Sequence, residues 1–274
     1  MVKAQRKTWM FWLLTFLIVG ILLACGQLPS VTGLVTTPTS ASPFQSHPAL
    51  NTWYSIKPGI ALRYEHWSSP GDNDDTVTIV RMNPKDIHLS VDYHPNEPTD
   101  IRGWMQQTHA TVLINGGYFD QDDHATALII SNGQVTGTSY EGFGGMLSVN
   151  KQGTIQLRSL RTQPYTPTEQ LEQATQSSPM LMVDGKRTQF SADAASQRRT
   201  VVAMDKQGNL LFIISPNEAF SLDELADLLV ASDLSLETAL NLDGGASTGL
   251  AINTGQHQQV IDSITALPIV IAVS

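Results

Sequence analysis

The sequence predicts an α+β fold, a single domain of mixed, antiparallel-rich β-sheets with a few covering helices. The first observation behind this prediction is that short apolar segments, rich in β-branched residues or alternating with period two, recur throughout residues 53–274. The second is that many of them flank Gly-containing turn sequences, which is typical of β-hairpins. The third is that only two segments carry apolar residues at helical spacing. Hairpins join neighbouring strands in opposite directions, so the sheets should be largely antiparallel.

Most of the domain is expected to be strand. Residues 76–82 mix β-branched with polar or apolar side chains, and residues 87–93 follow with a clearer alternation. Later strands are predicted in pairs around turns that contain Asn-Gly or a nearby Gly. These are 127–130 with 134–135, 146–149 with 154–157, and 201–204 with 210–214, besides a strand over 180–183 that runs into Asp184-Gly185.

Two helices are expected. The clearer one begins at Ser221, because Ser221 and Glu224 have the spacing of a capping box, in which each side chain binds a backbone N–H of the other residue. The leucines that follow share one face and should pack on a sheet. They are Leu222, Leu225, Leu228 and Leu229. A second helix is predicted over 100–109, with Ile101, Trp104 and Met105 inward.

The N-terminus has the pattern of a secretory signal. Three basic residues precede an apolar run from Trp9 to Ala24, which is marginal in length for a membrane-spanning helix. The run ends in Leu22-Leu23-Ala24-Cys25, which resembles the lipobox of bacterial lipoproteins. That resemblance implies cleavage after residue 24 and lipid attachment to the sulfur of Cys25. A plain signal anchor with an incidental cysteine is the alternative.

The domain organisation follows from this reading. Residues 1–24 are the predicted lipoprotein signal peptide, and 25–52 form a Ser/Thr/Pro-rich tether that cannot bury enough apolar surface to order itself. Residues 53–274 are long enough for one domain with a sizeable core. We therefore expect an extracytoplasmic lipoprotein, held to a membrane through Cys25.

The charge balance argues against nucleic acid as a partner. The full chain carries a net charge of −9, and loss of residues 1–24 removes three basic residues and no acidic one. The remaining 13 basic residues face 25 acidic ones, with no basic stripe to follow a phosphate backbone. Any bound phosphate must be met by a local cluster of donors.

Two predicted strands end in the same kind of turn. One leads into Asn115-Gly116-Gly117 and the other into Asp243-Gly244-Gly245. Glycines permit positive φ and let a ligand approach main-chain N–H groups closely. Either turn alone would be an ordinary strand end, since Asn, Asp and Gly are common turn residues. The pair predicts one shared site.

Two consecutive arginines strengthen that interpretation. Arg198 and Arg199 come directly before a predicted strand that begins near Thr200, in an acid-rich chain. A guanidinium there could bind an anionic oxygen with two parallel hydrogen bonds. The alternative is a surface ion pair, which contributes little to stability.

A serine hydrolase is the tempting alternative. Residues 245–249 match G-x-S-x-G around Ser247, but that motif needs a helix after the serine and an acid followed by a histidine. Here residues 250–255 are strand-like, and His257 precedes Asp262. The pattern therefore favours Asp243 over Ser247 as the reactive group.

No cofactor or metal site is predicted. The acidic run 120–124 fails the EF-hand pattern, because Ala125 stands where Gly is needed and Ser131 where Glu is needed. The histidines show no metal-ligand spacing. A divalent cation is compatible with this sequence but not indicated by it.

Four segments, taken in order, resemble the phosphodiester glycosidase family, which includes the lysosomal uncovering enzyme of the mannose-6-phosphate pathway and bacterial proteins linked to exopolysaccharide or cell-wall metabolism. The resemblance covers roughly residue 87 to the C-terminus, with Ala203, Ala246 and Thr248 departing from the usual Gly, Gly and Ser. The segments are N-G-G-Y-F (115–119), Q-R-R-T (197–200), S-L-D-E-L-A-D-L-L (221–229) and A-L-N-L-D-G-G (239–245).

The resemblance implies hydrolysis of a sugar-1-phosphodiester at the glycosidic C–O bond, in a glycan of the cell envelope or outside the cell. Asp243 would be the nucleophile or the base that activates water, and Glu141 a second carboxylate. Arg199 and Asn115 complete the predicted catalytic set. The predicted substrate-binding residues are Gly116, Gly117, Tyr118, Arg198, Thr200, Gly244, Gly245 and Ser247. A glycan-binding lipoprotein without catalysis is the alternative from another functional class.

Overall fold

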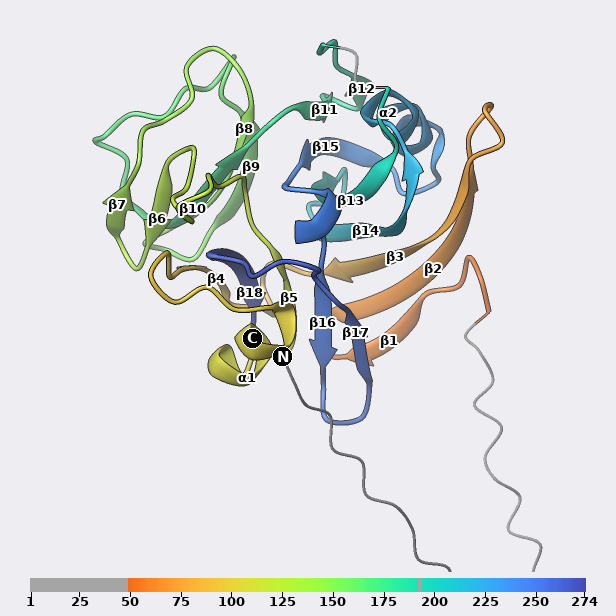
Figure 1. The fold of residues 1–274 in the computed structure, drawn as a ribbon, viewed down its shortest axis with the longest axis horizontal. Coiled ribbons are helices and arrows are strands. Elements are labelled where there is room, and N and C mark those ends of the chain that lie inside the picture. Colours follow the sequence, from red (N-terminus) through yellow and green to blue (C-terminus); the bar gives the residue numbers. More distant parts are fainter. Residues whose placement is uncertain (1–48, 192–193) are drawn as a thin grey trace, which may run out of the picture. The chain divides into compact units, whose positions relative to one another are not determined.

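Three antiparallel sheets make up the fold of the computed structural model, which describes residues 49–191 and 194–274 (Figure 1). All described strands and helices belong to one unit, His47–Ser274. The predicted signal peptide 1–24, Cys25 and most of the tether 25–52 lie outside the described residues and remain predictions. Among the described residues, no helix is long and apolar enough to cross a membrane.

The largest sheet has eight strands in the order β1-β2-β3-β14-β13-β15-β11-β12. Its strands are β1 (Tyr54–Lys57), β2 (Ile60–Ser68), β3 (Asp74–Met82), β14 (Leu210–Phe220), β13 (Gln197–Asp205), β15 (Leu236–Asn241), β11 (Met180–Val183) and β12 (Lys186–Arg187). β13 lies between β14 and β15, with Val201 opposite both Ile213 and Asn241.

Two five-stranded sheets complete the fold. One has the order β7-β6-β10-β8-β9, and the other β17-β16-β5-β18-β4. The first is built from β7 (Gln134–Thr136), β6 (Ile129–Ser131), β10 (Leu171–Ser177), β8 (Gly145–Asn150) and β9 (Ile155–Ser159). The second is built from β17 (Gln258–Ile261), β16 (Leu250–Asn253), β5 (Val112–Asn115), β18 (Ile269–Val273) and β4 (Leu89–Tyr93). Every strand pair in the described chain is antiparallel.

The fold is richer in strand than the predicted α+β class. The described residues contain two α-helices, α1 (Ile101–Thr108) and α2 (Leu222–Ala231), and one short 3-10 helix, η1 (Gly245–Ser247). The two predicted covering helices are present, but the sheets mainly cover one another. One apolar core takes side chains from all three sheets, for example Val80, Ile114 and Leu147.

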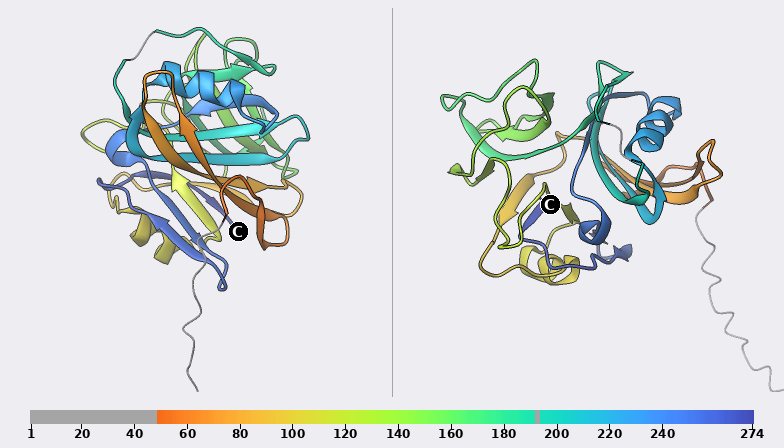
Figure 2. Two further views of the ribbon diagram at one scale, coloured as in Figure 1. Left: turned by 90° about the vertical axis from the view of Figure 1, so that its right-hand side faces the viewer. Right: turned by 45° about the horizontal axis from the view of Figure 1, so that its top comes forward.

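Each helix covers a sheet face that points away from this shared core (Figure 2). Leu225 and Leu229 of α2 pack with Val201 of the eight-stranded sheet, whereas Trp104 of α1 packs with Leu113 of β5. Several strands are therefore buried on both faces, which explains why β5 is apolar at consecutive positions and not alternating.

The local predictions agree with the structure within a few residues. Asn132-Gly133 and Asp184-Gly185 both have two consecutive positive φ angles, as type I′ hairpin turns require. The predicted capping box of α2 is present: Ser221 Oγ accepts from Glu224 N at 3.2 Å, and Glu224 Oε2 accepts from Ser221 N at 2.9 Å. The predicted helix over 100–109 is α1, whose cap is Asp100.

Candidate active site

The two Gly-Gly turns meet in space, although they lie on different sheets. The Asn115 turn follows β5, and the Asp243 turn follows β15. Asp243 N donates to the carbonyl of Gly116 at 3.2 Å, and Asn115 Nδ2 donates to the carbonyl of Asp243 at 2.8 Å. The predicted pairing of the turns therefore corresponds to a real junction between sheets.

Close main-chain packing explains the glycines at this junction. A Cβ atom on Gly117 would come within 2.4 Å of the carbonyl oxygen of Gln176, and one on Gly244 within 2.8 Å of that of Arg198. Two of the four glycines predicted to bind substrate donate their backbone N–H groups within the protein instead. Gly116 N binds the Ile269 carbonyl, and Gly244 N binds Asp243 Oδ1.

Asn115 acts as a buried clamp. Its side chain is only 1% exposed, and its Oδ1 accepts from Thr200 Oγ1 at 2.8 Å and from Gly249 N at 3.2 Å. With its bond to the Asp243 carbonyl, the amide joins β5, β13 and the chain on both sides of η1. Thr200 is fully buried and donates to this clamp. The geometry favours a positioning role for Asn115 and Thr200 over direct contact with substrate.

The carboxyl group of Asp243 lies partly buried at the end of β15. Burial raises its pKa above the usual aspartate value, while the Ser247 hydroxyl and the Gly244 amide lower it to a smaller extent. A carboxyl group held this way ionises later than a solvated one and is a stronger base when ionised. Such a group can attack an electrophilic carbon or activate water.

Tyr118 lies beside this carboxyl group. Its hydroxyl donates to the Ser178 carbonyl at 3.0 Å and accepts from Asn241 Nδ2 at 2.8 Å. Burial and the charge of Asp243 raise the pKa of Tyr118 to about 12, and the nearby charge of Arg199 opposes that rise. The phenol is therefore neutral at ordinary pH. These charge effects place Asp243, Arg199 and Tyr118 in one neighbourhood.

Asn241 belongs to the same neighbourhood and had no role in the sequence-based prediction. It lies two residues before Asp243 on β15 and opposite Val201 of β13, so period-two alternation could have suggested it. Its Oδ1 is buried and has no hydrogen-bond partner among the described residues, and the same holds for Ser177 Oγ and Thr175 Oγ1. Buried polar atoms without protein partners usually bind water or ligand.

The two arginines point to opposite faces of β13, as consecutive strand residues do. Arg199 Nε donates to the Phe220 carbonyl at 3.0 Å and its Nη2 to the Ala195 carbonyl at 2.7 Å. Arg198 Nε donates to the Pro216 carbonyl, and its Nη2 to the Asp262 carbonyl. Of the two arginines, only Arg199 influences the pKa of Tyr118, which its positive charge lowers. The structure therefore brings Arg199, and not Arg198, to the candidate site.

Burial distinguishes these arginines from surface ion pairs. Arg198 is 8% exposed and Arg199 is 5% exposed, and both bind main-chain carbonyls. Burial lowers the pKa of Arg198, against the attraction of Asp262 and Glu218.

Glu141 is exposed in the loop between β7 and β8 and has no hydrogen bond or ion pair with any described residue. Its neighbour Tyr140 reaches the site: Tyr140 raises the pKa of Tyr118 and stacks on Phe143 with ring centroids 4.5 Å apart. The structure therefore brings the loop close to the site without placing the Glu141 carboxylate beside Asp243.

Ser247 lies in η1, is 5% exposed and interacts through its hydroxyl with Asp243. The strand β16 follows it, and not the helix that a nucleophile elbow requires. His257 lies at the far end of β16, in the turn before β17. The geometry therefore gives no support to a serine nucleophile.

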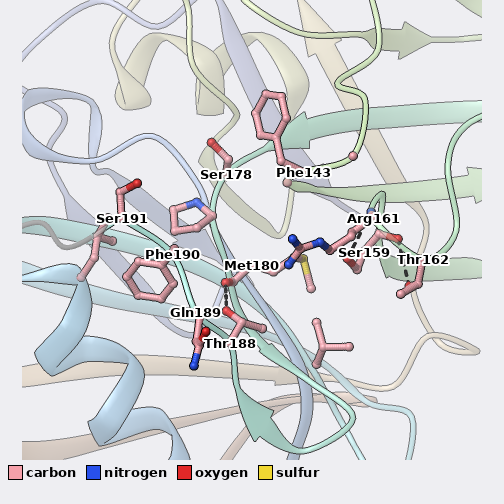
Figure 3. A pocket seen from close by; sticks show the side chains of 15 residues that line it. Phe143, Ser159, Arg161, Thr162, Ser178, Met180, Thr188, Gln189, Phe190 and Ser191 are labelled. Atoms are coloured by element: carbon pink, nitrogen blue, oxygen red, sulfur yellow. Dashed lines mark hydrogen bonds between the residues drawn. The ribbon is translucent and has the colours of Figure 1, made fainter.

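A cavity of about 530 Å³ opens next to Ser178, whose carbonyl accepts from Tyr118 (Figure 3). Asp243 does not line this cavity, so the cavity lies near the carboxylate and does not enclose it.

No group of three or more His, Cys, Asp or Glu side chains within 49–191 and 194–274 is placed to hold a metal ion. Asp120 of the acidic run caps its own loop by accepting from the backbone N–H groups of Asp122 and His124.

Comparison with known proteins identifies the class. A family model for phosphodiester glycosidases matches residues 108–273, and the chain belongs to this family. At a general level, membership places it among hydrolases that act on phosphodiester-linked sugars. No functionally curated protein matches the sequence.

Solved structures with the same fold come from distant organisms. The zebrafish N-acetylglucosamine-1-phosphodiester alpha-N-acetylglucosaminidase catalytic domain, auto-inhibited by its pro-peptide, has a TM-score of 0.61 at 18% identity, covering 80% of this chain and 85% of that chain. A hypothetical protein from Synechocystis has 0.60 at 17%, covering 83% and 64%. A putative exported protein from Burkholderia pseudomallei has 0.51 at 9%, covering 74% of each chain. At these identities the likeness shows the fold alone.

Proposed function

We propose that the protein hydrolyses a sugar-1-phosphodiester at its glycosidic C–O bond, in a glycan of the cell envelope or outside the cell. The observation that carries the proposal is the Asp243 carboxyl group, whose pKa is raised by burial at the junction of the two Gly-Gly turns. Tyr118 and the positive charge of Arg199 lie in the same neighbourhood.

In the proposed reaction, Asp243 either attacks the anomeric carbon or takes a proton from the water that does so. The C1–O bond breaks, its electron pair stays on the phosphate oxygen, and positive charge develops on the sugar ring. The departing phosphomonoester gains a second negative charge, which the nearby guanidinium of Arg199 stabilises.

The leaving group explains why one carboxylate suffices. A sugar alcohol must be protonated as it leaves, whereas a phosphomonoester has a second pKa of about 6 and is a stable dianion at neutral pH. Glu141, predicted as a second carboxylate, is therefore not required as a general acid, and we expect Glu141→Gln to retain most of the activity. The reaction uses no cofactor.

The full chain, purified in detergent, can be tested on N-acetylglucosamine-1-phosphodiesters, because the zebrafish relative is named for that linkage. In ¹⁸O-labelled water, cleavage of the C–O bond places the label in the sugar, and cleavage of the P–O bond places it in the phosphate. We expect label in the sugar. Label in the phosphate, or sugar release that survives Asp243→Asn and Arg199→Ala unchanged, would refute the proposal.

The same experiment separates the enzyme from a glycan-binding lipoprotein. A binding protein would retain the phosphodiester without releasing sugar from it under any condition. Turnover by the wild-type chain excludes that alternative.

We also propose that Cys25 carries a lipid and holds the protein on the outer side of a membrane. Cells fed an alkyne-labelled fatty acid should label the wild-type chain and not Cys25→Ser. The variant should also move from the membrane fraction to the soluble fraction. Equal labelling of both chains would contradict this proposal.

A further inference from the structure

The cavity beside Ser178 has walls from three parts of the chain. They are the loop around Phe143, the turn after β9 with Arg161, and the segment from Thr188 to Ser191 after β12 (Figure 3). Its volume of about 530 Å³ is in the range of small-molecule sites. Ser178 and Met180 also line it.

One hydrogen bond and one short stretch of chain connect the cavity to the candidate active site. The Ser178 carbonyl accepts from the Tyr118 hydroxyl, which lies beside Asp243. On another wall, Leu222 follows Phe220 by two residues, and the Phe220 carbonyl holds Arg199. These contacts place the cavity beside the candidate active site.

Arg161 is the only charged residue among those that line the cavity. Its guanidinium reaches toward Met180 (Figure 3) and has no ion pair or hydrogen bond with any described residue. Every other arginine of the described chain has such a contact or stacks on a ring. Carboxylates bind Arg63, Arg102, Arg158 and Arg187, carbonyls bind Arg198 and Arg199, and Arg81 stacks on Trp53.

A guanidinium without a partner among the described residues is notable in a chain with a net charge of −9, where carboxylates are abundant. Two aromatic rings line the same cavity. Phe143 is 51% exposed and stacks on Tyr140. Phe190, on another wall, is only partly exposed, and the guanidinium of Arg187 lies 5.2 Å from its ring centroid (Figure 3). An exposed ring and a guanidinium without a partner among the described residues, in one cavity, suit a ligand that has both an apolar ring face and a negative charge.

We propose that this cavity is a second subsite, which binds the next sugar phosphate of an extended substrate in which sugars are joined by repeating phosphodiesters. Arg161 pairs with the phosphate one unit beyond the scissile bond, and Phe143 and Phe190 contact the sugar between the two phosphates. The proposal rests on the proposed function, and it makes the natural substrate an anionic chain and not a small diester.

The kinetic test compares two probes. The short probe is the methyl diester of N-acetylglucosamine-1-phosphate, and the long probe carries a second N-acetylglucosamine-1-phosphate unit in place of methyl. Arg161→Gln should raise KM for the long probe by about 10- to 100-fold, the range expected for a charged hydrogen bond, and leave the short probe unchanged. Lys151→Gln, which removes an exposed charge in the β8–β9 turn, is the matched control and should change neither.

Other kinetic outcomes overturn the proposal. An unchanged KM for the long probe means that Arg161 does not bind its second phosphate. An equal rise for both probes places Arg161 at the scissile phosphate itself. A third probe with a neutral second sugar should bind the wild type and Arg161→Gln equally well, and a loss with this probe would assign Arg161 to sugar and not to phosphate.

A binding experiment separates this proposal from the proposed function. Calorimetry measures the affinity of the long probe for Asp243→Asn with and without Arg161→Gln, where no turnover is needed. Weaker binding of the double variant supports the subsite even if the wild-type chain cleaves nothing. Turnover by the wild type with no effect of Arg161→Gln on affinity refutes the subsite and leaves the hydrolase standing.

Discussion

The two Gly-Gly turns have nearly the same sequence but different environments. Asn115 is 1% exposed, and both ends of its amide are bound by protein groups from three segments. Asp243 is partly exposed, and its carboxyl group interacts with its neighbouring amide Gly244 and with Ser247.

The difference shows how one kind of turn can take two roles. A neutral amide can be buried between sheets because it both donates and accepts there. A carboxylate only accepts, and burial without enough donors raises its pKa. We infer that Asn115 holds the junction together and that Asp243 performs the chemistry.

Asp243→Asn is expected to have the largest effect. Activity on a sugar-1-phosphodiester should fall by about 10²- to 10⁴-fold, the range for a group that takes part in proton transfer or attack. The protein should stay folded, since the amide has the same shape and keeps the bond from Gly244. Steady-state kinetics together with circular dichroism would check this. Activity within a few-fold of wild type would assign the chemistry to another residue.

The reverse exchange, Asn115→Asp, should act on stability. It would place a carboxylate in a fully buried position and remove the donor to the Asp243 carbonyl. The free energy of unfolding should drop by about 3 kcal/mol or more. Urea titration measures it, and Asn132→Asp, in the exposed β6–β7 turn, is a control expected to change little. A stable Asn115→Asp chain would mean that Asn115 is not a clamp.

A second acidic residue, Glu224, sharpens the comparison, because its carboxylate accepts hydrogen bonds from several donors. Hydrogen bonds from Ser69, Asn73 and Ser221 lower its pKa to about 2. Glu224→Ala should reduce the free energy of unfolding by about 1 kcal/mol, as loss of a helix cap does, and leave kcat unchanged. Because its folded pKa is depressed, this contribution is present above the unfolded pKa near 4.5 and is lost as the pH falls toward 2. A large loss of kcat would contradict a purely structural role.

The smallest expected effect is that of Asp243→Asn on the melting temperature. Its pKa is raised, so the folded protein holds this proton more tightly than the unfolded chain, and ionisation destabilises the fold as the pH rises through the folded pKa. Asp243→Asn should therefore melt slightly higher than wild type at pH 7, with the difference closing below about pH 4. Calorimetry at several pH values measures this. A lower melting temperature at pH 7 would show that the carboxylate stabilises the fold.

Local signals explain what the sequence predicted well. The capping box at Ser221, the hairpin turn at Asn132-Gly133 and the strand before Asp243 depend on residues within a few positions of each other. The clamp role of Asn115 does not, because its partners Thr200 and Gly249 lie 85 and 134 residues away. The order of strands in the sheets also depends on residues far apart in the sequence. The same is true of the packing of the sheets on one another, which is why the fold is richer in strand than the predicted α+β class.

The roles of Arg198 and Arg199 also depend on contacts with residues far away in the sequence. Their position before a strand suggested an anion site, yet only the fold decides that Arg198 binds the Asp262 carbonyl while Arg199 lies near Tyr118. Nothing in the sequence around Arg161 indicated that its guanidinium has no partner in the described part of the chain.

The position of β5 between β16 and β18 has a consequence for how the protein matures. Both neighbours come late in the sequence, so the strand that carries Asn115 has two open edges until residues 250–273 have been synthesised. Pairing over such sequence distances is slow compared with local hairpins. Until these strands have been added, Asn115 lacks its sheet neighbours on both sides, and we expect the junction at Asp243 to form only after the last strand has joined the sheet.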